Sequence, residues 1–219
     1  MFVVVFFTGP PLLCGNTRPL LVPAANSLLP NCLVRSDAVD SELEHLVRTQ
    51  GCKTWALKIA AKGSHLSSAL MTPSWESVQR AIRGSTKKPD NLFGKRLVFF
   101  PLCRYDHWVL AVADLERRTI CTYDSLKGSS GAPNPLGLGV KNYLMVRQEL
   151  LGLSHLGGFS ILPDATCPQQ ENVQDCGIYL CLFARRLASG QQVGRFTPAR
   201  ANLYREEMRA RILQHGLLA

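Results

Sequence analysis

The spacing of apolar and polar positions predicts four amphipathic helices and one buried helix. The amphipathic helices carry apolar residues at intervals of three and four, so that each has one buried face. Their apolar stripes are Val39, Leu43, Leu46 and Val47; Trp75, Val78 and Ile82 after Thr72-Pro73; Tyr143, Val146 and Leu150; and Tyr204, Met208 and Ile212. The first-turn proline in Thr72-Pro73 is typical of a helix start.

The buried helix follows Cys176. The run from Ile178 to Leu187 is apolar until Arg185, which favours a central element covered on all sides. Asp175 is placed to cap the start of this helix, and Ser189-Gly190 is placed to end it. We therefore expect a polar loop to deliver the Cys176 thiol to the first turn of a buried helix.

Runs rich in Val, Phe and Ile predict strands. They cover Arg96 to Phe100, His107 to Ala113 and Thr119 to Tyr123, with a short fourth run from Phe159 to Leu162. Residues 128–139 contain several Gly and two Pro, which predicts a loop. Together these elements lead us to expect an α+β fold, with a mixed, mostly antiparallel sheet and the Cys176 helix packed against it.

The 219 residues suffice for one good-sized core. Residues 1–32 are almost free of charge and lack periodicity, so we expect an irregular arm of unknown role there and a single domain over residues 33–219. The apolar residues 2–7 follow no positive charge and are too few for a signal peptide or a membrane span. We expect no membrane association.

The net charge of +9 and the spacing of the cysteines limit the kinds of partner and metal site that we expect. Basic residues outnumber acidic ones seven to two in both 75–104 and 185–219, but no aromatic residues alternate with them. These segments therefore indicate solvated helix faces, or a patch that steers an acidic protein, and no nucleic-acid partner. The eight cysteines form no Cys-x-x-Cys pair, which argues against a zinc site. We expect no metal or cofactor, and reduced thiols in the nucleus or cytoplasm.

Two strand residues can complete a reactive site with Cys176. If the hairpin loop between the second and third predicted strands is centred between Leu115 and Glu116, paired residues sum to 231 and His107 faces Asp124. Their Cβ atoms would then lie about 5 Å apart on one face. An odd loop would instead place Tyr123 or Ser125 opposite His107.

Each of these residues alone has an ordinary structural explanation, since a free cysteine is commonly a small buried apolar residue. Together they supply a nucleophile, a base and a group that orients the base. Gln170, six residues before Cys176, adds a side-chain amide that could stabilise negative charge on a carbonyl oxygen, with Gln169 and Gln174 as alternatives.

Four motifs, in order and spacing, resemble those of the ubiquitin-like-protein-specific proteases, the family of the SUMO (sentrin) proteases. They are His107-Trp108, Tyr123-Asp124-Ser125, Cys167-Pro168-Gln169-Gln170 and Asp175-Cys176-Gly177-Ile178-Tyr179. The resemblance runs from about Val39 to the C-terminus and implies a papain-like, adenain-like cysteine protease fold. It implies Cys176 as nucleophile, His107 as general base and acid, Asp124 as the orienting residue, Gln170 in the oxyanion hole and Trp108 in the wall of a narrow substrate channel.

The resemblance thus predicts a thiol protease that cleaves after the C-terminal Gly-Gly of SUMO or another ubiquitin-like modifier, acting on its conjugates as a monomer. One departure concerns the N-terminal side. The family usually has a Trp-Leu-Asn-Asp-like segment that completes the channel, whereas this chain has Leu33-Val34-Arg35-Ser36-Asp37. Three alternatives stay open: a deubiquitinase, an acetyltransferase using the same Cys-His-Asp site, and a catalytically inactive modifier-binding protein.

Overall fold

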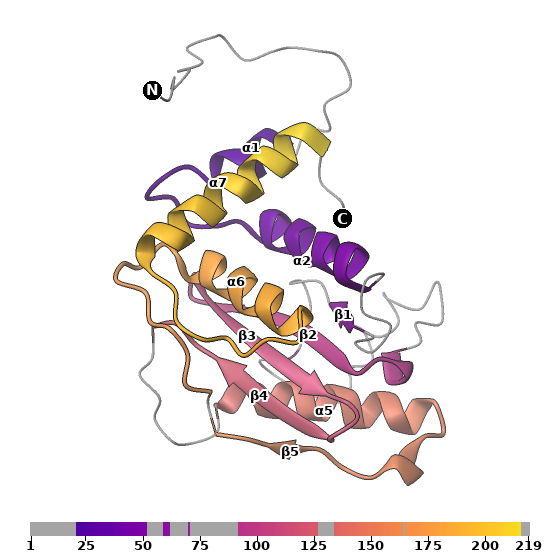
Figure 1. The fold of residues 1–219 in the computed structure, drawn as a ribbon. Helices are drawn as coiled ribbons and strands as arrows, with labels where there is room; N and C mark the ends of the chain where they lie inside the picture. The colour runs from indigo at the N-terminus through magenta and orange to yellow at the C-terminus, as the bar shows by residue number, and fades with distance from the viewer. Residues whose placement is uncertain are drawn as a thin grey trace, which may run out of the picture.

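The computed structural model describes residues 21–51, 59–61, 70, 92–126, 134–163 and 165–215. In these residues a five-stranded sheet lies between α5 on one face and a stack of helices on the other (Figure 1). The strands, in order across the sheet, are β1 (Ile59–Ala61), β2 (Leu97–Arg104), β3 (His107–Asp114), β4 (Thr119–Tyr123) and β5 (Ser160–Ile161). The helices are α1 (Leu21–Asn26), α2 (Ser36–Gly51), α5 (Pro135–Leu150), α6 (Cys176–Ala188) and α7 (Pro198–His215), with short 3-10 turns η1 (Leu92–Gly94) and η2 (Ser154–Leu156).

The sheet is mixed, as expected from the sequence. Its two long ladders, β2 with β3 and β3 with β4, are antiparallel. The short outer strands β1 and β5 are parallel to their neighbours. The α+β fold class is therefore confirmed, with the predicted strands present within a few residues of their expected bounds.

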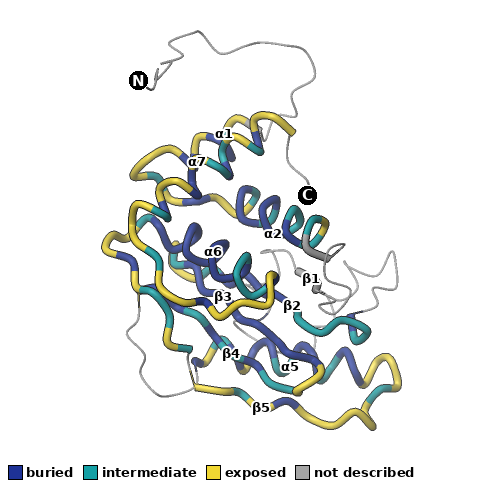
Figure 2. Tube along the Cα trace, viewed as in Figure 1, coloured by how far each residue is buried: buried dark blue, intermediate teal, exposed yellow. Residues whose placement is uncertain are grey.

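The core has two parts, one on each face of the sheet. Trp108 and Leu110 of β3 belong to the part shared with α2, α6 and α7, whereas Ala111 and Ala113 belong to the part shared with α5. Figure 2 shows that α6 and β3 are buried along most of their length. Burial of each large apolar side chain contributes about 1.5–3 kcal/mol, so this contact between α6 and β3 is a main source of stability.

The predicted helices at 39–47, 143–150, 176–188 and 204–212 are confirmed as α2, α5, α6 and α7. The predicted helix after Thr72 lies outside the described residues. The predicted loop over 128–139 is wrong from residue 135 on, because Asn134 caps α5 through its side chain and Pro135 occupies the first turn. Gly137 and Gly139, which suggested a loop, serve close packing instead, since a Cβ on either would press on a neighbouring segment.

The prediction of an irregular arm is wrong for its second part. Residues 21–26 form α1, which packs against α7, and Ala24, Ala25 and Leu28 join the main core with at most 1% exposure. Small apolar residues spaced by one helical turn were too few to give a periodic signal. Residues 1–20 lie outside the described part of the chain.

The hairpin register differs from the prediction by two residues. Asp114 pairs with Thr119 and Leu110 with Tyr123, so that paired residues sum to 233, and the same register continued by one residue aligns Asp124 with Val109. The cause is the side chain of Asp114, which accepts a hydrogen bond from the Arg117 backbone N–H at 2.9 Å and closes the turn at that point. The loop is even, as assumed, but its centre lies one residue further along.

No helix in the described ranges combines the length and the apolar character that crossing a membrane requires.

The close passage of α5 past Leu70 gives a test of the fold. A Cβ at Gly139 would lie 2.0 Å from the carbonyl oxygen of Leu70. We expect Gly139→Ala to lower the free energy of unfolding by about 1–3 kcal/mol, because backbone atoms would have to move. Gly158→Ala is the control: nothing lies within 4 Å of that Cβ, so its effect should stay below about 0.5 kcal/mol. Urea denaturation measures both, and equal effects would contradict the packing.

Candidate active site

Cys176 is the first residue of α6, and only 1% of it is exposed. Its Sγ lies 3.7 Å from the carbonyl oxygen of Asp106, the residue before β3. The unpaired backbone N–H groups at a helix N-terminus favour negative charge. The position predicted for the thiol is therefore the observed one, and it suits a cysteine that reacts as a thiolate.

A tight turn brings β3 to this point. Arg104 pairs with His107, and the two residues between them, Tyr105 and Asp106, have φ values of 50° and 59°. Two left-handed residues in a two-residue hairpin are typical of a type I′ turn. The sequence did not predict this turn or the place of Asp106 beside the thiol, because Tyr105-Asp106 lacks the Asn-Gly signature that usually marks such a turn.

His107 and Asp124 are in contact. The Nε2 atom of His107 lies 2.8 Å from Oδ1 of Asp124. The two-residue register shift leaves both on the same face of the sheet, where diagonal neighbours remain within reach of long side chains. The Asp124 side chain is 6% exposed and that of His107 27% exposed, so the pair lies at the edge of the core.

The pairing changes the acidity of the imidazole. The hydrogen bond to Asp124, and then the neighbouring Cys176 side chain, raise the pKa of His107 from 6.5 to about 9, against the opposing effect of burial. At neutral pH the ring is therefore protonated on both nitrogens and positively charged in the folded protein. Since Asp124 occupies Nε2, the nitrogen left for the thiol is Nδ1, which is buried and makes no hydrogen bond among the described residues.

A second thiol lies near the site and behaves differently. Cys103 of β2 pairs with Trp108 across the ladder. Burial, followed by the nearby Cys176 and Asp106, raises the pKa of Cys103 to about 11. Cys103 therefore stays protonated at neutral pH and does not compete as a nucleophile.

Gln170 is buried beside the triad, with 8% exposure. Its Oε1 accepts a hydrogen bond from Ser125 Oγ at 2.5 Å, and its Nε2 donates to the carbonyl oxygen of Asn172 at 2.6 Å. The amide is thus fixed at both ends, and one N–H of its Nε2 remains for another acceptor. Ser125 orients the amide through this bond, and the 45 residues between the two give no sequence signal for the contact.

The other two glutamines are placed differently. Gln169 donates to the backbone carbonyl of Asp124 at 2.9 Å and is exposed. The Gln174 carbonyl accepts from Arg205, and its N–H donates to Asn172. Of the three candidates, Gln170 is the buried one next to Asp124 and Ser125.

The capping role predicted for Asp175 is wrong. Its side chain makes no hydrogen bond to the first turn of α6. The carboxylate instead accepts from Arg205 Nη2 at 2.6 Å and from Asn172 Nδ2 at 2.8 Å. A buried guanidinium is a stronger partner than backbone amides, and no signal local to residue 175 indicates it.

Trp108 lies under the N-terminal segment. Its indole N–H donates to the carbonyl oxygen of Val34 at 3.0 Å, and the residue is 4% exposed. A Cβ at Gly177 would lie 2.8 Å from Val34 Cβ and 3.3 Å from Trp108 Cδ1. Glycine after the cysteine therefore lets Val34 and Trp108 approach the start of α6. Val34 belongs to the segment Leu33-Val34-Arg35-Ser36-Asp37, which contains no tryptophan.

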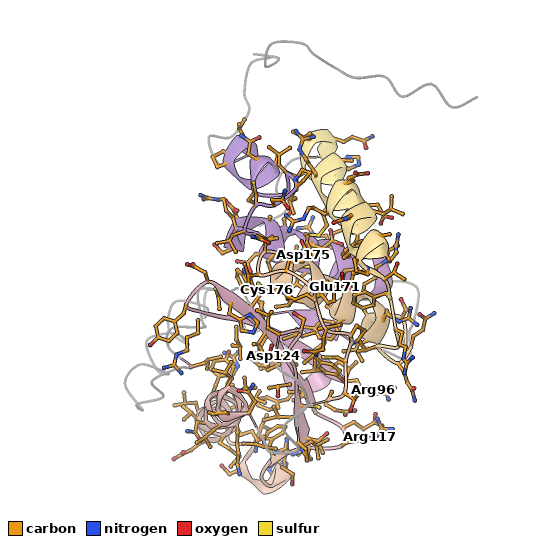
Figure 3. The ribbon with its side chains drawn as sticks, turned by 90° about the vertical axis from the view of Figure 1, so that its left-hand side faces the viewer. Arg96, Arg117, Asp124, Glu171, Asp175 and Cys176 are labelled. Carbon is orange, nitrogen blue, oxygen red and sulfur yellow. The ribbon has the colours of Figure 1, made fainter. Side chains whose placement is uncertain are left out.

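A cavity of about 490 Å³ opens beside the His107–Asp124 pair. Arg104 and Tyr105 of the turn line one part of it, and residues 134–136 at the start of α5 line another. The cavity therefore gives access to the His107 ring from the side of the β2–β3 turn, and Cys176 is not among its lining residues. In Figure 3 Cys176 lies between Asp175, on the side of α7, and Asp124, on the side of the sheet.

The described residues hold no group of three or more His, Cys, Asp or Glu side chains that could bind a metal ion. The six cysteines among them are present as thiols and not as disulfides.

The profile of the Ulp1 protease family, C-terminal catalytic domain, matches residues 68–215. A sentrin-specific protease of Caenorhabditis elegans is 30% identical over 162 residues, which are 74% of this chain and 22% of that protein. The Ulp1 protease domain solved in complex with Smt3, the yeast ortholog of SUMO, superposes with a TM-score of 0.69 at 23% identity, covering 90% of this chain and 83% of that one. The Ulp1-like SUMO protease catalytic domain of Chaetomium thermophilum gives a TM-score of 0.71 at 21% identity, with coverages of 88% and 76%.

These structural similarities are low in identity and establish the fold. The chain spans between a fifth and a quarter of the length of the curated relatives it matches, 22% of the C. elegans protein and 24% of a rat sentrin-specific protease 2.

The raised pKa of His107 predicts a pH-dependent contribution to stability. Between pH 6.5 and about 9 the folded protein holds a proton on His107 that the unfolded chain releases. Stability from the pair is therefore complete below pH 6.5 and is lost as the pH rises through 9. We expect the difference in unfolding free energy between the wild type and His107→Gln to shrink from pH 6 to pH 9.5 in urea titrations. A difference that stays constant over this range would contradict the pairing.

Proposed function

This chain belongs to the Ulp1 protease family, and on that premise we propose that it is a thiol protease that cleaves after the C-terminal Gly-Gly of a ubiquitin-like protein, with SUMO as the first candidate. The observation that carries the proposal is the convergence of Cys176, His107 and Asp124, from a helix start, a strand start and a strand end, at one site. These three residue types supply nucleophile, acid–base group and orienting carboxylate.

In the first step the Cys176 sulfur, having given its proton to His107, attacks the carbonyl carbon of the terminal glycine. The new C–S bond moves an electron pair onto the carbonyl oxygen. The backbone N–H of Cys176 and the remaining N–H of Gln170 then stabilise this oxyanion. Removal of one such donor typically costs about 10²–10³-fold in rate.

In the next steps His107 moves the proton. The imidazolium gives it to the departing lysine amine as the C–N bond breaks, which leaves a thioester on Cys176. His107 then takes a proton from water, whose oxygen attacks the thioester, and the C–S bond breaks to restore the thiolate. Asp124 holds the ring through Nε2 and so leaves Nδ1 to exchange the proton with the sulfur.

Specificity for a Gly-Gly end follows from the surroundings of the sulfur. We assign Trp108 as one wall of the channel, since its ring packs against Gly177, directly after the nucleophile. Val34 takes part on the opposite side, where relatives usually carry a tryptophan. A side chain on either terminal residue of the modifier would not pass between such walls.

The partner assignment is supported by the relative solved with Smt3. SUMO or another ubiquitin-like protein, together with its conjugates, is the proposed partner, and the nucleus or cytoplasm is the proposed location, because a free catalytic thiol needs a reducing compartment. The family match favours this activity over an acetyltransferase and over a binding protein without activity.

Activity-based probes test the proposal. SUMO and ubiquitin, each carrying an electrophile in place of the C-terminal carboxylate, are incubated with the protein, and the labelled residue is identified by peptide mapping. We expect the SUMO probe to label Cys176. Substitution Cys176→Ala should abolish labelling, and His107→Ala should slow cleavage of a SUMO conjugate by about 10²-fold or more.

Iodoacetamide, a general thiol reagent, is the control for a folded and accessible thiol. If it alkylates Cys176 while neither probe does, the assignment of a ubiquitin-like substrate is wrong. Labelling by the ubiquitin probe alone would make the protein a deubiquitinase.

A further inference from the structure

Arg205 of α7 is the most buried arginine near the active site, with 3% exposure. Its guanidinium donates to five acceptors. They are the carbonyl oxygens of Ser27, Leu29 and Cys32 at 3.0–3.3 Å, the carbonyl oxygen of Gln174 at 3.3 Å and the carboxylate of Asp175 at 2.6 Å. One side chain thus ties the C-terminal helix to the N-terminal segment and to the two residues that precede Cys176.

Hydrogen bonds through Asn172 connect Asp175 to Gln170. Asn172 donates from Nδ2 to the second carboxylate oxygen of Asp175 at 2.8 Å. Its own Oδ1 accepts from the backbone N–H groups of Gln174 and Asp175, both at 3.0 Å. Its backbone carbonyl accepts the Gln170 amide at 2.6 Å. The loop from 170 to 176 is therefore held by a continuous hydrogen-bonded chain that ends at Arg205.

The ion pair between Arg205 and Asp175 also keeps a negative charge away from the first-turn N–H groups of α6. Asp175 directly precedes the helix, where an aspartate commonly caps the first-turn N–H groups. Here Arg205 and Asn172 hold the carboxylate away from those groups. A carboxylate on the first turn would compete with a developing oxyanion for the same donors and would repel it.

We propose that Arg205 is a positioning residue for catalysis: through Asp175 and Asn172 it fixes the 170–176 loop, so that Gln170 and the Cys176 N–H remain free and aligned for the oxyanion. This inference rests on the proposed function. Arg205 does not contact the substrate, and it acts on the acyl-transfer step through the geometry of the loop.

The competing explanation is that Arg205 only stabilises the fold, because loss of one partner of a buried ion pair is strongly destabilising. Two reactions of the same sulfur separate these explanations. Hydrolysis of a modifier's C-terminal amide builds an oxyanion, whereas alkylation by iodoacetamide displaces iodide at a saturated carbon and builds none. A positioning role affects the first reaction and spares the second.

Arg205→Met and Asn172→Ala are the test variants. Asn172 is exposed, so its variant should fold even if Arg205→Met does not. For each we expect kcat on a SUMO coumarin amide to fall by about tenfold or more, with KM little changed. The alkylation rate of Cys176 should stay within about threefold of the wild type, because it needs no oxyanion donor.

Arg211→Met is the matched control. Arg211 lies on the same helix and pairs with the buried carboxylate of Glu42 at 2.7 Å, far along the sequence from the loop. This variant should lower the melting temperature and leave kcat per folded molecule unchanged. Arg205→Lys, which retains the charge but not the fork of donors, should recover part of the lost kcat.

The outcomes are distinct. A parallel fall of hydrolysis and alkylation, or an unchanged kcat in Asn172→Ala and Arg205→Met, would overturn the positioning role. A wild-type protein that hydrolyses neither the SUMO nor the ubiquitin coumarin amide would instead overturn the proposed function.

Discussion

The packing of α6 against β3 is the contact on which the site depends. Both elements are buried on nearly all sides, and the first residue of each, Cys176 and His107, lies at the same end of the contact. Because the apolar interface between them is long, the two first residues are held in place by the whole core. A buried helix also presents its N-terminal N–H groups in a region of low dielectric, where their effect on a thiolate or an oxyanion is stronger than at the surface.

On each side of the Cys176 thiol an acidic side chain is paired with a basic one: Asp124 with His107, and Asp175 with Arg205. On the sheet side, Asp124 carries a negative charge and keeps a proton on His107 at neutral pH, as its pKa of about 9 requires. On the α7 side, Asp175 also carries a negative charge, but Arg205 neutralises it within the protein. The thiol therefore lies between a proton donor and a helix start without a free carboxylate. Such an arrangement favours negative charge on sulfur or on a substrate oxygen and disfavours additional anions.

The N-terminal segment from 21 to 34 packs against this site. Its carbonyl groups accept from Arg205, and the carbonyl of Val34 accepts from Trp108, so the segment covers both the loop before Cys176 and the ring beside Gly177. These contacts involve backbone atoms, which any residue provides. A segment without a family motif can therefore complete the site.

The sequence by itself determined the elements and the reacting groups. The apolar pattern placed the buried helix at Cys176. The predicted hairpin register was wrong by two residues, but His107 and Asp124 still lie on one face of the sheet, because an even shift preserves the face. Tertiary structure decided what depends on distant partners. Arg205 drew Asp175 away from the helix it was expected to cap, and α7 gave residues 21–28 a surface on which to fold. In both cases a distant partner outweighs a local preference. Arg205 is 30 residues away from Asp175, and the spacing of residues around Asp175 does not indicate such a partner.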